Sequence, residues 1–129
     1  MDKAFMVELL KNYSFYKSRR ILLEKELSVI RQPNNMVTIN DADLIKKLEN
    51  ELSQLQHKID TIEIGLKLIG EYNERYKIII ESHYLHNVRI EDIADMTHMS
   101  RSRCYELCNS AVTYMTRIVF GDRQNISII

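Results

Sequence analysis

Two pairs of side chains in this sequence have the type and spacing of metal ligands. Cys104 and Cys108 are one helical turn apart, and His83 and His86 are three residues apart. Structural zinc requires four ligands, and neither pair has an evident second pair to complete the set. We therefore interpret the cysteines as buried core thiols and the histidines as ordinary side chains, and we expect no metal and no cofactor.

A different chemistry is indicated by Arg101 and Arg103, which directly follow Ser100. A serine hydroxyl is a good N-terminal cap for a helix. Arginines in the first turn of such a helix are suited to contact phosphate and guanine, and a solvated charged face is the alternative interpretation. The sequence shows no nucleophile–base pair, glycine-rich phosphate loop or carboxylate cluster at catalytic spacing, so we do not expect an enzyme or a small-molecule substrate.

Residues 89–109 have the spacing of a helix-turn-helix motif. Ala94 is the small residue that allows two helices to cross closely, Ile93 fills the core beside it, and Met99 is the apolar residue of the turn. On the second helix, the residues expected to pack inward are Cys104, Leu107, Cys108, Ala111 and Met115. The candidate DNA-binding residues of this helix are Ser100, Arg101, Ser102, Arg103, Tyr105, Glu106 and Asn109. Further basic candidates are Arg75, Lys77 and Arg89.

Residues 74–118 resemble the region-four helix-turn-helix of bacterial sigma factors. The resemblance is carried by Glu74-Arg75, His83-Tyr84-Leu85-His86-Asn87, Ile90-Glu91-Asp92-Ile93-Ala94 and Ser100-Arg101-Ser102-Arg103. Asn87 stands where that family usually has glycine, and asparagine is the next best residue for a left-handed turn. His98 stands at a turn position that often requires a positive φ. Tyr105 and Glu106 replace the basic and glutamine positions of the family.

The whole layout, two long helices followed by this module, is similar to the small phage and prophage late-gene activators of the RinA/ArpU type. That resemblance implies binding to double-stranded promoter or operator DNA and a contact with host RNA polymerase. Sigma region two, which melts promoters, has no counterpart, so we do not expect a complete sigma factor. Two other hypotheses are a coiled-coil protein-interaction protein and a DNA packaging adaptor similar to small terminases, although those usually place the DNA module first.

The elements that would position these residues form an all-α fold. We expect a long, coiled-coil-like helical hairpin in residues 1–70, a three-helix helix-turn-helix module in residues 71–120, and a tail in residues 121–129. Three glycines and one proline favour long uninterrupted helices. The helices expected in the module are 73–85, 90–96 and 101–119. In the first of them, Tyr76, Ile79, Ile80 and Tyr84 are expected to point inward.

The first hairpin helix is expected at about residues 3–30 and ends before Pro33 and the two asparagines that follow it. Its apolar seam consists of Met6, Leu9, Tyr13, Tyr16, Leu23, Leu27 and Ile30, with Arg20 at one seam position. The second helix is expected to begin with an Asn40 cap and an Ile39–Leu44 hydrophobic staple and to end near Gly70. Its seam consists of Ile45, Leu48, Leu52, Leu55, Ile59, Ile62, Leu66 and Ile69.

Two interpretations of these seams remain open. The first is an intramolecular antiparallel hairpin, and the second is that the seam also, or instead, forms a homodimer, because two helices alone make a thin core. The residues expected at that dimer interface are Leu48, Leu52, Leu55, Ile59, Ile62 and Leu66.

Composition favours a folded cytoplasmic protein. Hydrophobic residues make up 45% and charged residues 28%, and no apolar run has the length of a membrane span or a signal peptide. Two cysteines are too few for a disulfide framework. The formal net charge is zero, which argues against a simple polyelectrolyte binder, although residues 97–129 carry a small positive net charge.

Overall fold

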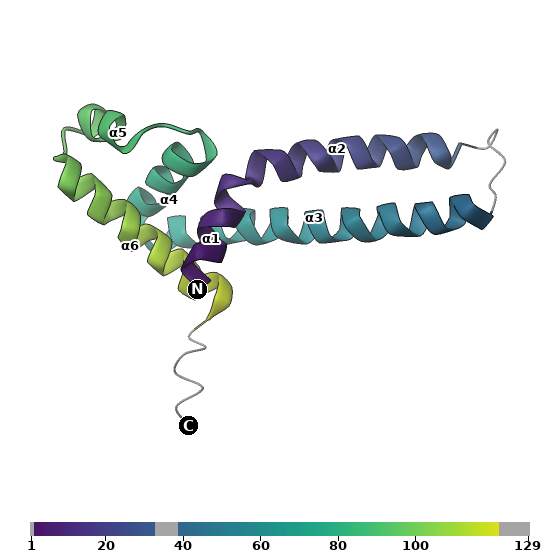
Figure 1. Cartoon of the computed structure of the whole chain (residues 1–129). Helices are drawn as coiled ribbons and strands as arrows, with labels where there is room; N and C mark the ends of the chain where they lie inside the picture. The colour runs from purple at the N-terminus through teal and green to yellow at the C-terminus, as the bar shows by residue number, and fades with distance from the viewer. Residues whose placement is uncertain (1, 33–38, 122–129) are drawn as a thin grey trace, which may run out of the picture. The chain divides into compact units, whose positions relative to one another are not determined.

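The computed structural model describes residues 2–32 and 39–121, and within them every regular element is a helix (Figure 1). The α-helices are α1 (Asp2–Lys11), α2 (Tyr13–Ile30), α3 (Ile39–Tyr72), α4 (Glu74–Ile80), α5 (Ile90–Thr97) and α6 (Arg101–Phe120). A short π-helix, η1 (Glu81–Leu85), continues α4. The predicted all-α fold, a helical hairpin followed by a helix-turn-helix module, is confirmed.

Three of the sequence predictions fall on residues outside this description. They are the break at Pro33, the Asn40 cap with its Ile39 staple, and the tail after Gly121. Residues 39 and 40 are described as helical, but their side chains are not described. Among the described residues, no helix combines the length and the apolar composition that crossing a membrane requires.

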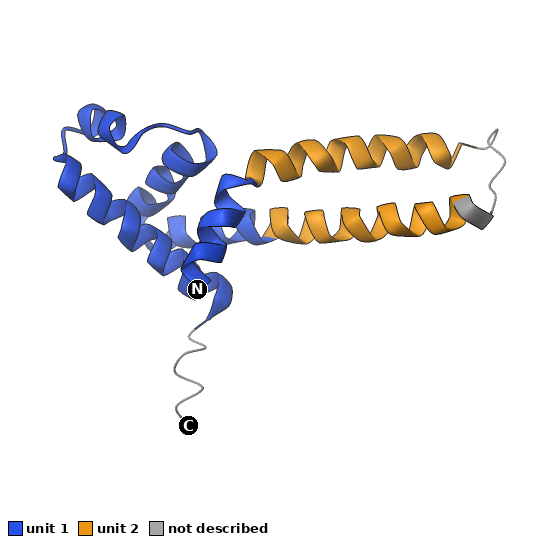
Figure 2. Ribbon diagram, viewed as in Figure 1, with its two compact units in different colours: residues 1–12, 61–129 blue, residues 13–60 orange. Residues whose placement is uncertain are grey.

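The chain divides into two compact units, and residues 13–60 make up one of them (Figure 2). In this unit α2 runs antiparallel to the first part of α3. Three cross-helix pairs fix the register: Arg19 forms two hydrogen bonds to the Glu51 carboxylate (2.7 and 3.1 Å), Arg31 forms an ion pair with Glu49 (3.0 Å), and Lys58 lies over the Tyr16 ring. The buried side chains of the hairpin are Tyr16, Leu23, Leu27, Leu48, Leu55 and Ile59.

Arg20, the polar residue of the first seam, is half-buried and finds a partner on the facing helix. Its Nη1 donates to Gln56 Oε1 (3.1 Å), and Gln56 Nε2 in turn donates to Asp60 Oδ1 (2.8 Å). Because its guanidinium is hydrogen-bonded, Arg20 is compatible with the intramolecular pairing of the two seams.

The second seam is covered by the single chain itself, and the intramolecular hairpin is therefore the interpretation that the structure supports. Of the expected dimerisation residues, Leu48, Leu55, Ile59, Ile62 and Leu66 are buried and Leu52 is half-buried. Within the single chain these side chains pack against the chain itself, and the expectation that they also contact a second copy stays a prediction.

The other unit contains the described residues of 1–12 and 61–129, so it is built from both parts of the sequence (Figure 2). Its N-terminal helix, α1, packs against α6 and η1, and buries Met6 and Leu10 completely. The continuous helix predicted for residues 3–30 is interrupted at Asn12, whose Nδ2 donates to the Glu8 carbonyl (2.8 Å) and the Glu8 carboxylate (3.1 Å). Asparagine side chains compete in this way with helical hydrogen bonds.

The domain boundary predicted at residue 70 differs from this division, because the end of α3 belongs with the C-terminal helices. Gly65 shows why. A Cβ atom at Gly65 would lie 2.9 Å from Met115 Cε and 3.4 Å from Val119 Cγ2, so α3 and α6 approach closely at this point. Two turns further along α3, the Tyr72 ring stacks on the Tyr114 ring with the centroids 4.0 Å apart.

The predicted helix at residues 73–85 is present but changes character after Ile80. Asn73 caps α4 by accepting a hydrogen bond from the Arg75 amide (3.0 Å), and η1 ends with a bond from the His86 amide to the Glu81 carbonyl (2.9 Å). Asn87 then adopts the left-handed conformation expected of it, with φ of 58°. This turn leads the chain into α5.

Candidate nucleic-acid interface

The turn between α5 and α6 has the geometry that the helix-turn-helix spacing predicts. His98 is in the left-handed region (φ 57°, ψ 34°), and the Met99 amide donates to the Ala94 carbonyl (3.0 Å). Thr97 Oγ1 closes the last turn of α5 by donating to the Ile93 carbonyl (2.7 Å). Ile93 and Ala94 are buried, as expected for the residues at a close helix crossing.

Ser100 is the N-cap of α6, as predicted. Its Oγ accepts a hydrogen bond from the Arg103 amide (3.1 Å), so one of the unpaired amides of the first turn is satisfied and the start of the helix is fixed at Arg101. The face predicted to pack inward does so. Cys104, Cys108, Ala111 and Met115 are buried, and Leu107 is half-buried.

The opposite face of α6 is exposed to solvent along its N-terminal half. The exposed residues are the predicted ones: Ser100, Arg101, Ser102, Arg103, Tyr105, Glu106 and Asn109. Successive helical residues are separated by about 100°, so Arg101 and Arg103 project from opposite flanks of α6. Within the described part of the chain, neither arginine side chain forms a hydrogen bond or an ion pair.

Tyr105 links the exposed face of α6 to α5. Its hydroxyl donates to Glu91 Oε1 (2.7 Å), and this hydrogen bond is the main reason that the pKa of Glu91 is lowered and the pKa of Tyr105 is raised. The lowered pKa keeps the Glu91 carboxylate charged, and the positive charges of Arg89 and Arg101 contribute to lowering it. The sequence did not predict this pair, because the two residues are separated by the turn.

Arg89, one of the further basic candidates for DNA binding, forms an ion pair with a carboxylate. Both Nε and Nη2 donate to Asp92 (3.2 Å each), in the first turn of α5. The pKa of Asp92 is lowered, first by this hydrogen bond and also by the charges of Arg89 and Arg101. The Arg89 side chain is 73% exposed, and its Nη1 group is not part of the contact with Asp92.

A basic residue far away in the sequence joins the exposed face of α6. Lys3, on α1, donates a hydrogen bond from Nζ to Asn109 Oδ1, across 106 positions of the sequence. It adds a positive charge at the end of the predicted DNA-binding face. No sequence pattern pointed to Lys3, because its place depends on the packing of α1 against α6.

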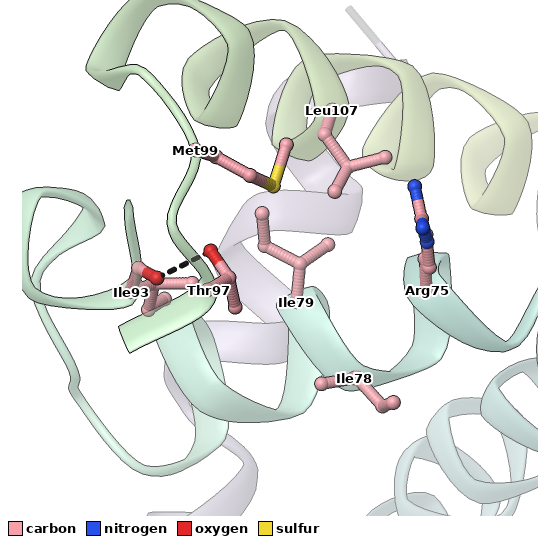
Figure 3. A pocket seen from close by; sticks show the side chains of 7 residues that line it. All are labelled: Arg75, Ile78, Ile79, Ile93, Thr97, Met99 and Leu107. Atoms are coloured by element: carbon pink, nitrogen blue, oxygen red, sulfur yellow. Dashed lines mark hydrogen bonds between the residues drawn. The ribbon is translucent and has the colours of Figure 1, made fainter. Parts of the chain in front are cut away.

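The two remaining basic candidates lie on α4. Lys77 is 3.9 Å from Glu81 Oε1 in a loose ion pair. Arg75 lies at a hollow of about 380 Å³ between α4, α5 and α6, whose apolar walls include Ile79, Ile93 and Leu107 (Figure 3). Neither residue belongs to the exposed face of α6.

Of the two pairs with metal-ligand spacing, both cysteines are buried, His83 is hydrogen-bonded and His86 is exposed. Cys104 and Cys108 are free, buried thiols, and burial raises the pKa of both. The pKa of Tyr84, next to Cys108, is raised to about 12, mainly by burial. His83 Nδ1 donates to the Val88 carbonyl (2.9 Å). The described residues contain no cluster of three or more His, Cys, Asp or Glu side chains that could hold a metal ion.

Comparison of this chain with known protein families, with curated proteins and with solved structures gave no match.

Proposed function

We propose that this chain is a sequence-specific DNA-binding transcription regulator that reads double-stranded DNA with α6. The observation that carries the proposal is the first turn of this helix. There, Ser100 caps the helix while Arg101 and Arg103 extend into solvent without a side-chain partner among the described residues. Two guanidiniums at a capped helix start are arranged to contact phosphates and the guanine edge in a major groove.

The acidic side chains near this surface limit where the phosphates of DNA can approach. Glu91 and Asp92 lie in the first turn of α5, where the helix dipole favours negative charge, and each is held by a partner, Tyr105 or Arg89. They would repel phosphates that approach α5. The proposed DNA therefore approaches α6 and depends on its two arginines rather than on a broad basic surface, in keeping with a net charge of zero.

Within this class, the resemblance to phage late-gene activators suggests activation of transcription through host RNA polymerase as the specific role. That role is a proposal of its own, and it requires α6 to bind DNA. The test is a transcription assay with purified polymerase, on a template that carries the DNA sequence the chain binds. Adding the chain should increase the amount of transcript if the activator role is correct, and should leave it unchanged if the role is wrong.

DNA binding is tested by selection from a randomised duplex pool with the full chain, followed by fluorescence anisotropy on the selected duplex. We expect enrichment of a defined sequence and a loss of affinity of at least tenfold in the double variant Arg101→Ala/Arg103→Ala. Lys46→Ala/Lys47→Ala is the matched control, because it removes two exposed positive charges from the hairpin. Equal binding by the double variant and the control would overturn the proposal.

A further inference from the structure

The hollow between α4, α5 and α6 has the size of a small-molecule site. Its volume is about 380 Å³, and pockets of about 300–1,000 Å³ commonly hold small ligands. The residues that line it all belong to the unit that contains these three helices. None of them is among the exposed candidate DNA-binding residues of α6. The hollow is therefore formed within one unit and is separate from the proposed DNA-reading face.

The walls of the hollow are mainly apolar. Ile78 and Ile79 come from α4, Ile93 from α5, Met99 from the turn and Leu107 from α6. Figure 3 shows the side chains of Ile79, Met99 and Leu107 pointing toward one another across the hollow. Ile78 is 53% exposed, so part of the apolar wall is in contact with water. A ligand with an apolar body would remove this surface from water, which favours binding.

Two polar side chains line the hollow, and only one of them has a partner. Thr97 Oγ1 donates to the Ile93 carbonyl (2.7 Å), so this hydroxyl can accept one further hydrogen bond. The Arg75 guanidinium forms no hydrogen bond or ion pair with a described residue. None of the described residues that line the hollow is acidic. The hollow thus combines apolar walls with one uncompensated positive charge.

This combination selects one class of ligand. A guanidinium binds a carboxylate through two parallel hydrogen bonds, so Arg75 matches a single carboxylate group. A sugar or a free phosphate would leave the apolar walls uncovered and would place polar groups against them without partners. A neutral hydrocarbon would leave Arg75 unpaired, and an alkyl ammonium ion would be repelled by it.

We propose that the hollow binds a small amphipathic carboxylate, such as the anion of a medium-chain fatty acid. Its alkyl chain lies against the apolar walls, and its carboxylate pairs with Arg75 at the edge of the hollow. This assigns Arg75 a role other than phosphate contact. The proposal does not rest on DNA binding, so each of the two can fail without the other.

Octanoate is the probe, and NMR of the methionine methyl groups in the full chain is the readout. A titration over roughly 0.1–10 mM should shift the Met99 signal with saturation, with a dissociation constant on the order of 1 mM. The signals of Met6 and Met115 should not shift, because both side chains are completely buried. Each methylene that enters the hollow strengthens binding by up to about fourfold. Butanoate should therefore give no measurable shift.

The charge of the ligand is tested with octanol and octylamine, which have the same chain length as octanoate but no negative charge. Both should bind about fivefold more weakly than octanoate, the factor that an exposed ion pair contributes at the upper end of its range. Arg75→Gln should weaken octanoate binding by the same factor and leave octanol binding unchanged.

Lys25→Ala is the matched control. It removes one exposed positive charge from the rim of another apolar hollow, which lies in the hairpin unit and also carries Glu26 at its rim. This variant should bind octanoate as the parent does. The proposal is overturned if Arg75→Gln binds octanoate as tightly as the parent, or if octanol binds as tightly as octanoate. The octanol comparison uses only the parent chain, so it decides the question even if Arg75→Gln does not fold.

Discussion

The hydroxyl of Tyr105 lies 2.7 Å from the carboxylate of Glu91 and joins the two helices of the helix-turn-helix. This contact crosses the turn at His98 without using any core side chain. Because the Glu91 carboxylate also interacts with the charge of Arg101, the same hydrogen bond affects both the stability of the motif and the electrostatics of its exposed face.

The first prediction concerns the pH dependence of this contact. The pKa of Glu91 is lowered in the folded chain from an ordinary value of 4.5, and the pKa of Tyr105 is raised from 10.0. A carboxyl group whose pKa is lowered on folding stabilises the fold at pH values above its unfolded-state pKa, and this stabilisation is lost as the pH falls through its folded-state pKa. A tyrosine whose pKa is raised on folding stabilises the fold at pH values below its unfolded-state pKa, and this stabilisation is lost as the pH rises through its folded-state pKa. Tyr105→Phe should therefore be less stable than the parent at pH 7, and the difference should shrink in acid.

Urea denaturation of both chains at pH 7 and at a pH below the titration of Glu91 would measure this. Glu91→Gln provides the second arm, because it keeps the shape of the acceptor and removes its charge. A difference between parent and Tyr105→Phe that is the same at both pH values would show that the hydrogen bond does not carry the effect.

The second prediction separates the roles of the two arginines. Arg103→Ala should reduce the preference between DNA sequences by about 1–3 kcal/mol, because a bidentate guanine contact is lost. Arg101→Ala should weaken all sequences alike and lower the slope of log affinity against log salt by about 0.9. Anisotropy titrations at several salt concentrations, on the selected duplex and a scrambled duplex, measure both quantities. Both side chains are exposed, so the melting temperature should not change.

The third prediction compares two glycines of α3. Gly65→Leu should destabilise the fold by about 1–3 kcal/mol, because the added side chain would collide with Met115 and Val119 in the α3–α6 contact. Gly70→Ala should stabilise it by up to about 1 kcal/mol through helix propensity, since its Cβ would meet only the flexible side chain of Lys77. Thermal and chemical unfolding of the two variants provide the comparison, and an equal effect of both would refute the close approach at Gly65.

The fourth prediction concerns the buried thiols. Burial raises the pKa of Cys104 and Cys108, so both should be poorly reactive towards a thiol reagent at pH 8 in the folded chain and rapidly modified in denaturant. Ultraviolet titration should find one tyrosine, Tyr84, with a pKa of about 12. Replacing Tyr84 by Phe should remove that titration. Rapid labelling of the folded chain would contradict the burial of these thiols.

Local chemistry made much of the fold predictable from sequence. The Ser100 cap, the left-handed residues Asn87 and His98 and the small Ala94 each follow from a residue type at a fixed offset in a turn. The seam of α3 likewise follows from its heptad spacing. Such features depend on residues close together in the chain, and the structure has each of them as predicted.

The parts that the sequence did not predict all depend on contacts between distant segments. The break at Asn12 occurs inside an apparently continuous heptad pattern, and the uninterrupted seam of α3 conceals the place where one unit ends and the other begins. Lys3 joins the candidate site through tertiary packing alone. The sequence correctly predicted which residues of α6 share an exposed face. The hydrogen bond between Tyr105 and Glu91 could not be predicted, because it depends on the angle at which α5 and α6 cross.

The packing of α1 against α6 also determines when this chain can complete its fold during synthesis. Helix α1, with its buried Met6 and Leu10, is synthesised well before α6, one of the helices that it packs against. At about 5–20 residues per second, α1 waits on the order of 5–20 seconds for its partner. Both helical segments of the hairpin unit, residues 13–60, are synthesised before α6, so this unit can form while the unit that contains α1 and α6 is still incomplete.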